Sequence, residues 1–193
     1  MKRFVAAAAL SAALLLEQPA RAAAGEAQSA PQRLCEAEIA RAAQRYNIPV
    51  SVLYAIGVTE SGRKGSLQAF TLNMAGASWF GASLEEAMGK FAEARARGIT
   101  LIDVGCMQIN HRFHGRHFAS LAAMFDPALN IDYAARFLLQ LKASQGSWTM
   151  AVARYNAGPN NDPAQKRYVC AVIANMVATG FGNWTNNARR FCL

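Results

Sequence analysis

The sequence predicts a mainly α-helical protein with one domain at residues 34–193. The length of 193 residues is in the usual range of a single domain. From Leu34 onward, apolar residues recur at intervals of three and four, a spacing typical of helices with one buried face. Proline and glycine residues divide this pattern into segments, and we find neither an internal repeat nor the continuous apolar strands of a parallel sheet.

Residues 1–24 are predicted to be a secretory signal peptide rather than part of this domain. Lys2 and Arg3 are positively charged, the stretch 4–16 is almost entirely apolar, and small residues before position 25 suit a cleavage site. The apolar stretch is short for a membrane span, and an uncleaved anchor is the alternative. The polar residues 25–33 are interpreted as a linker. We therefore expect an exported protein that has no membrane span after cleavage.

The predicted helices follow one another along the chain. A first helix begins near Leu34 and ends before Pro49, because the residue that precedes a proline is disfavoured in a helix. A second begins at about Val50, with Ser51 as a candidate N-cap. Further along we expect a hairpin or loop at 70–83, a helix at 84–97 with a capping box of Ser83 and Glu86, a helical turn at 103–110, and helices at 128–144, 148–155 and 164–178.

The cysteines agree with export. An even number of cysteines in an exported chain favours two disulfides. No two of them form the CxxC pair of a zinc or thioredoxin-like site. Three pairings are possible among Cys35, Cys106, Cys170 and Cys192.

The formal net charge of +8 is compatible with an anionic partner as well as with ordinary solubility. Cell-wall polymer, a membrane surface and nucleic acid are all anionic, and charge alone does not choose among them. The basic residues are scattered, no nucleic-acid-binding motif is present, and export argues against nucleic acid as the partner.

Glu60 is the carboxylate with the most informative position. It follows Ile56 by four residues and Leu53 by seven, so its side chain shares their apolar helix face near the C-terminal end. Apolar surroundings and the negative end of the helix dipole both disfavour the charged form, which raises the pKa as a general acid requires. Position alone also suits a glutamate that turns into solvent.

Four short motifs place Glu60 in a wider pattern. In chain order they are Glu60-Ser61, Gly105–Asn110 (GCMQIN), Tyr155–Gly158 (YNAG) and Arg167–Val169 (RYV). Together they resemble the catalytic domain of the soluble lytic transglycosylase family. The stretches around the second motif resemble the small exported members associated with secretion systems, conjugation or flagella. The resemblance covers about residues 34–172.

This resemblance implies a lysozyme-like fold of the goose type, with a groove for the glycan strands of peptidoglycan. Glu60 would be the only catalytic carboxylate. It would protonate the β-1,4 glycosidic oxygen between MurNAc and GlcNAc and then act as base toward the muramoyl 6-hydroxyl. The product would be a 1,6-anhydromuramoyl end, formed without water, cofactor or metal. The implied substrate-binding residues are Ser61, Met107, Gln108, Asn110, Tyr155, Asn156 and Tyr168.

Some of these residues also have a structural interpretation. Met107, Tyr155 and Tyr168 are of residue types that suit a protein core.

The resemblance further implies a disulfide pairing and individual roles for the site residues. Relatives with a cysteine at position 106 tend to carry one like Cys35, which implies the pairs Cys35–Cys106 and Cys170–Cys192. The implied roles are positioning of the acid by Ser61, lining of the groove by Met107 and Gln108, orientation of the sugar by Tyr155 and Asn156, and contact with Glu60 by Tyr168.

Three further features stand outside the motifs. Asp103 is a candidate second carboxylate, although its place in the family implies a structural cap or turn. The segment 62–104 is longer than in the smallest relatives, so Asn73 and Trp79 within it are candidates for the groove wall. A solvent-exposed basic loop without a metal is expected for His111, His114 and His117, because Gly115 and two arginines interrupt them.

Two other functions use the same residues. A goose-type-like lysozyme would employ Glu60 to deliver water, and a catalytically silent protein would bind the wall during assembly of an envelope apparatus. We expect a periplasmic monomer that acts on peptidoglycan, with a secretion, conjugation or flagellar apparatus as a further partner.

Overall fold

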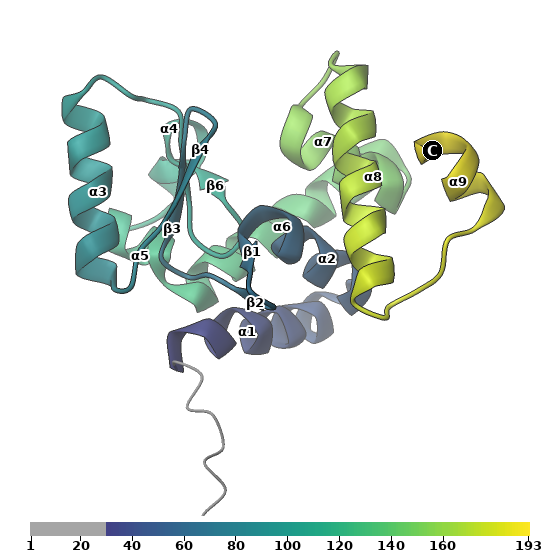
Figure 1. Ribbon diagram of the computed structural model, residues 1–193, viewed down its shortest axis with the longest axis horizontal. Helices are drawn as coiled ribbons and strands as arrows, with labels where there is room; N and C mark the ends of the chain where they lie inside the picture. Colours follow the sequence, from purple (N-terminus) through teal and green to yellow (C-terminus); the bar gives the residue numbers. More distant parts are fainter. Residues whose placement is uncertain (1–29) are drawn as a thin grey trace, which may run out of the picture.

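The computed structural model of the protein describes residues 30–193 (Figure 1). The predicted signal peptide and residues 25–29 of the predicted linker lie outside the described residues. Helix α1 begins at Ala30, inside the stretch predicted as linker. The α-helices are α1 (Ala30–Tyr46), α2 (Val50–Ser61), α3 (Leu84–Ala96), α4 (His111–His114), α5 (Leu121–Phe125), α6 (Pro127–Gln145), α7 (Trp148–Ala157), α8 (Asp162–Ala178) and α9 (Asn186–Cys192).

Local signals set most helix boundaries. The Ser83 side chain accepts a hydrogen bond from the Glu86 amide and so caps α3, as the sequence predicts. Asp126 caps α6 in the same manner, and Gly146 ends this helix at a φ of 79°. Helix α2 instead begins after Pro49 without a side-chain cap, so the expectation that Ser51 is its cap is wrong.

Two small antiparallel sheets accompany the helices. The strand order of the larger sheet is β4-β3-β5-β6, and the hairpin predicted within residues 70–83 is confirmed by its first two strands. A short hairpin of β1 and β2 directly follows α2. The strands are β1 (Gly62–Arg63), β2 (Ser66–Leu67), β3 (Thr71–Met74), β4 (Ala77–Phe80), β5 (Ile102–Val104) and β6 (Ile109–Asn110).

The helical turn predicted at 103–110 is wrong. This segment forms β5 and β6, joined by the turn 105–108, with Asp103 opposite Asn110. Strand β5 also pairs with β3, which places Leu72 opposite Val104. A hairpin of two such short strands is only marginally stable alone. Hydrogen bonds from β5 to β3, about 30 residues earlier in the chain, therefore decide the conformation of this segment.

Helix α2 lies at the centre of the fold, between α1 and α8. Figure 1 shows α3 and the larger sheet on one side of it and α7, α8 and α9 on the other. Leu53 and Ile56 of α2 are completely buried, and each contributes about 1.5–3 kcal/mol through its removal from water. This packing fixes the end of α2, where Glu60 lies.

Both disulfides implied by the family resemblance are present. Cys35–Cys106 connects α1 to the turn between β5 and β6, and Cys170–Cys192 connects α8 to α9. The sequence pattern did not predict α9, α4, α5 or the 3₁₀ turn Gly115–His117. Within residues 30–193, none of the helices combines the length and apolar character that a membrane span requires.

Candidate active site

A cavity of about 590 Å³ opens between the larger sheet and α7. Its wall is built from the end of α2, the turn between β3 and β4, strands β5 and β6, and parts of α4, α6 and α7. Segments from most of the domain therefore contribute to one site. The predicted site residues that line it are Glu60, Gln108, Asn110, Tyr155 and Asn156.

Glu60 lies in the last turn of α2 and faces this cavity. Burial of its carboxyl group raises the pKa of Glu60 to about 8. A hydrogen bond from Tyr168 opposes this shift, and the negative charge of Asp103 adds to it. The carboxyl group is therefore largely protonated at neutral pH and has a proton to donate.

Tyr168 reaches Glu60 from α8. Its hydroxyl donates a hydrogen bond to Oε1 of Glu60, and its ring is buried beside α2 rather than in the cavity wall. A second bond ties the same helices together, because Nδ2 of Asn175 donates to Oγ1 of Thr59 at 2.9 Å. Burial raises the pKa of Tyr168 well above its usual range, so its hydroxyl stays a donor.

Asp103 is the second carboxyl group of the cavity wall. Burial raises its pKa, and the hydrogen bond from Asn110 opposes the rise. That bond joins Nδ2 of Asn110 to Oδ1 of Asp103 at 2.7 Å across the paired strands. The expectation of a cap or turn at Asp103 is wrong, because the residue lies within β5 between two buried neighbours.

Gln108 and Tyr155 both line the cavity, Gln108 from the turn between β5 and β6 and Tyr155 from α7. Gln108 adopts a φ of 45°, and its Nε2 donates to the carbonyl oxygen of Gly105 at 2.9 Å. The hydroxyl of Tyr155 donates to the carbonyl oxygen of Met107 at 2.9 Å. The ring of Tyr155 therefore has a fixed orientation in the wall, next to Asn156 in α7.

The transglycosylase SLT domain family matches residues 38–175, well over half of the chain. The chain belongs to this family. The match spans Glu60, Gln108, Tyr155 and Tyr168, and the lysozyme-like, mainly α-helical fold expected from the sequence is confirmed. Comparisons with curated proteins and with solved structures gave no match.

Three predicted site residues of this SLT domain do not line the cavity, namely Tyr168, which lies beside α2, together with Ser61 and Met107. Ser61 is buried, and its hydroxyl donates to the carbonyl oxygen of Cys106 at 2.7 Å. Met107 is completely buried in the core, so the expectation that its side chain lines the groove is wrong. Ser61 supports the turn 105–108 through its bond to Cys106, and the buried Met107 side chain anchors the turn in the core. Their motifs did not reveal these contributions.

The segment 62–104, which is longer than in the smallest relatives, contributes part of the cavity wall. Asn73 lines the cavity together with Ala75 and Gly76 of the turn between β3 and β4. Trp79 does not line it and packs against the core instead. Its backbone carbonyl accepts a hydrogen bond from Oγ1 of Thr71 at 2.8 Å, which holds the two strands together.

The three histidines do not form the exposed loop that the sequence predicts. His114 lies in α4, lines the cavity and has its Nδ1 2.7 Å from the hydroxyl of Tyr133. Its ring also packs against Phe137, and burial lowers its pKa. Within the described part of the chain, no group of three or more His, Cys, Asp or Glu side chains comes together to hold a metal ion.

Sequence reasoning missed an apolar part of the wall. Phe113 and Leu101 line the cavity although 59% and 43% of their surfaces are exposed. Phe137 and Arg154 complete this side. Apolar residues left exposed at a cavity are a functional signal, but exposure becomes visible only in the folded chain.

Proposed function

We propose that this SLT domain cleaves the β-1,4 bond between MurNAc and GlcNAc in peptidoglycan without consuming water. Members of the family are lytic transglycosylases, which makes peptidoglycan the substrate class. One observation carries the proposal for this chain: the Glu60 carboxyl group faces the cavity with its pKa raised to about 8. Such a group is protonated when the substrate arrives and is basic enough to take a proton back.

The proposed reaction uses Glu60 twice. Glu60 first gives its proton to the glycosidic oxygen, and the bond from that oxygen to C1 of MurNAc breaks. The 2-acetamido oxygen of the same sugar stabilises the positive charge that develops at C1. The Glu60 carboxylate then takes the proton of the 6-hydroxyl while this oxygen bonds to C1, which closes the 1,6-anhydro ring and restores the acid. No water enters the balance.

The surrounding residues support these two steps. The Tyr168 hydroxyl donates a hydrogen bond to Glu60 Oε1 and so stabilises the Glu60 carboxylate that exists between the first and the second step. The amides of Gln108 and Asn156 line the cavity, where they are available to the sugar hydroxyls and the acetamido group. Tyr155 offers its ring to the sugar, because its hydroxyl is already bonded to the Met107 carbonyl.

A hydrolytic muramidase is the second candidate, and the presence of Asp103 in the same wall favours it. A carboxylate there would orient a water molecule toward C1 once Glu60 has protonated the leaving oxygen. Mass spectrometry of digested sacculi separates the two reactions. Anhydro ends support the transglycosylase, whereas reducing muramic-acid ends would replace it with the muramidase.

The catalytic assignment itself is tested by Glu60→Gln, which removes the proton donor and keeps the shape. Digestion of sacculi by this variant is expected to be lost. Glu93→Gln is the matched control, because Glu93 is half-exposed in α3 and does not line the cavity. Undiminished digestion by Glu60→Gln would leave Glu60 without a catalytic role. A wall-binding protein without activity would instead bind sacculi and release no fragments even as the wild type.

The proposal extends to where the protein acts. The predicted signal peptide and the two disulfides support export to the periplasm, where cysteines are oxidised. Local opening of the wall for an envelope-spanning secretion, conjugation or flagellar apparatus is the cellular role that we propose for a monomer. Fractionation of cells that produce the full chain tests the location: a cytoplasmic, uncleaved product would contradict it.

A further inference from the structure

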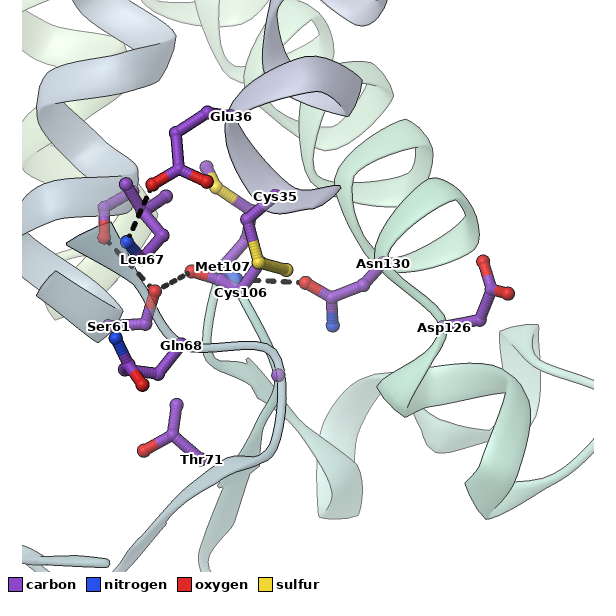
Figure 2. Close-up of a disulfide and its surroundings, with 12 residues drawn as sticks. Cys35, Glu36, Ser61, Leu67, Gln68, Thr71, Cys106, Met107, Asp126 and Asn130 are labelled. Atoms are coloured by element: carbon purple, nitrogen blue, oxygen red, sulfur yellow. Dashed lines mark hydrogen bonds between the residues drawn. A yellow bond between two sulfur atoms is a disulfide. The ribbon is translucent and has the colours of Figure 1, made fainter. Parts of the chain in front are cut away.

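Asn130 is a fully buried polar residue near the start of α6 that the proposed mechanism does not use. Its Oδ1 accepts a hydrogen bond from the Met107 amide at 2.8 Å. Its Nδ2 donates to the carbonyl oxygens of Val104 at 2.9 Å and Met124 at 2.8 Å. Figure 2 shows its carboxamide pointing from α6 toward the backbone at Met107. One side chain therefore joins α6, β5 and the turn 105–108.

The turn 105–108 is held at every residue. Gly105 has a φ of 80°, and a Cβ atom there would lie 2.7 Å from Nδ2 of Asn130, so only glycine leaves room for the carboxamide. Cys106 is bonded to Cys35, and its carbonyl accepts from the Ser61 hydroxyl (Figure 2). The left-handed φ of Gln108 is uncommon for a residue with a side chain and persists because these contacts enforce it.

The turn is also in contact with the candidate active site. Gln108 lines the cavity, and the Met107 carbonyl is the acceptor for the Tyr155 hydroxyl. The Met107 amide and carbonyl belong to adjacent peptide groups, so the bond from Asn130 helps to set the direction of that acceptor. A shift of the turn would move the Gln108 amide and the Tyr155 ring together.

We propose that Asn130 is a positioning residue, which orients the turn 105–108 so that Gln108 and Tyr155 face the glycan in their working geometry. It acts through these residues and does not touch substrate. The proposal rests on the proposed function, because it assigns Asn130 to the cleavage reaction of the same cavity. Displacements of about 1 Å in such supporting groups lower rates by up to about a hundredfold.

The test compares Asn130→Asp with Ile131→Ala. The first keeps an acceptor for the Met107 amide but loses the two donated bonds, and the second removes apolar contacts from a fully buried neighbour. We expect kcat/KM on soluble peptidoglycan to fall about tenfold or more for Asn130→Asp and to stay within about twofold of wild type for Ile131→Ala. Thermal melts confirm that both are folded at the assay temperature. If Asn130→Asp does not fold, Asn130→Ser is used in its place.

A double-mutant cycle separates positioning from general destabilisation. If Asn130 acts through Gln108, Asn130→Asp adds little to the loss already caused by Gln108→Ala. Ile131→Ala combined with Gln108→Ala is expected to be additive. Wild-type activity of Asn130→Asp, a loss no larger than that of Ile131→Ala, or an additive cycle would each overturn the proposal.

A binding measurement distinguishes failure of the Asn130 proposal from failure of the proposed function. In a Glu60→Gln background, Asn130→Asp is expected to weaken the affinity for a soluble GlcNAc–MurNAc tetrasaccharide, measured by calorimetry. Unchanged affinity would overturn the positioning role. Persistent cleavage by Glu60→Gln would contradict the proposed function instead, and the binding comparison would still decide the role of Asn130.

Discussion

The hydroxyl of Tyr168 donates a hydrogen bond to Oε1 of Glu60, a residue 108 positions earlier in the chain. Burial and this bond act on the Glu60 carboxyl group in opposite directions. Burial raises the pKa, the bond lowers it, and burial prevails because the pKa is raised to about 8. The pH dependence of activity is therefore a direct measure of this pair.

Tyr168→Phe is expected to raise the pKa of Glu60 further, because the anion loses its donor. The upper limb of the pH profile of kcat/KM, where activity is lost through deprotonation of Glu60, then moves to higher pH. Turnover falls because the carboxylate formed during the reaction is less stable. Tyr46→Phe removes a comparable bond to Asp132 outside the cavity and leaves the profile in place. A shift to lower pH in Tyr168→Phe would contradict the assignment.

Asp103→Asn is expected to shift the same limb in the other direction. The negative charge of Asp103 raises the pKa of Glu60, so its removal lowers that pKa and the upper limb moves to lower pH. The new side chain keeps an amide oxygen that can accept from Nδ2 of Asn110, which preserves the link between β5 and β6. An NMR titration of the Glu60 carboxyl carbon measures the shift, and an unchanged pKa would remove Asp103 from the electrostatics of the site.

The free energy of unfolding is also expected to depend on pH through Glu60. Its carboxyl group has a pKa near 4.5 when free and about 8 in the folded chain. Between these values the unfolded state releases the proton and the folded state keeps it, so stability falls as pH rises through this window. Glu60→Gln removes this loss. The melting temperature of Glu60→Gln minus that of the wild type should therefore increase as the pH rises from about 4.5 to about 8.

Periodicity predicted the long helices because one buried face suffices to define them, as in α6 with its buried Ile131 and Leu138. It failed at residues 103–110, where pairing with β3 from a distant part of the chain decides the structure. The motifs identified Glu60 and its tyrosine correctly as neighbours. They did not distinguish a side chain that faces the cavity from one beneath it, because a motif records residue type and order but not burial.

The two disulfides are expected to contribute unequally. Cys35–Cys106 spans 71 positions and Cys170–Cys192 spans 22, so loss of the first removes more constraint from the unfolded chain, by about 1 kcal/mol. Paired Cys→Ser replacements, followed by denaturant unfolding, measure this difference. The first pair should also lose activity, since Cys106 belongs to the turn that carries Gln108. Equal activity in the two double variants would contradict that link.

Ser61→Ala is expected to destabilise the protein without touching the cavity wall. The variant leaves the buried Cys106 carbonyl without the hydroxyl that donates to it, at a cost of about 1–3 kcal/mol. Ser144→Ala is the control, because its hydroxyl bonds to a carbonyl at the exposed end of α6. Denaturant unfolding of both variants provides the comparison, and an equal change in the two would refute the importance of the Ser61 bond.

The distance in sequence between Glu60 and Tyr168 also sets the order in which the site is completed. The ribosome makes the acid early, in α2, and adds the helix that bonds to it only after α7. A chain interrupted before α8 carries the acid, the turn and Tyr155, yet it lacks the helix that packs against α2. The finished centre therefore exists only once synthesis has passed α8, and products truncated before this helix do not contain it.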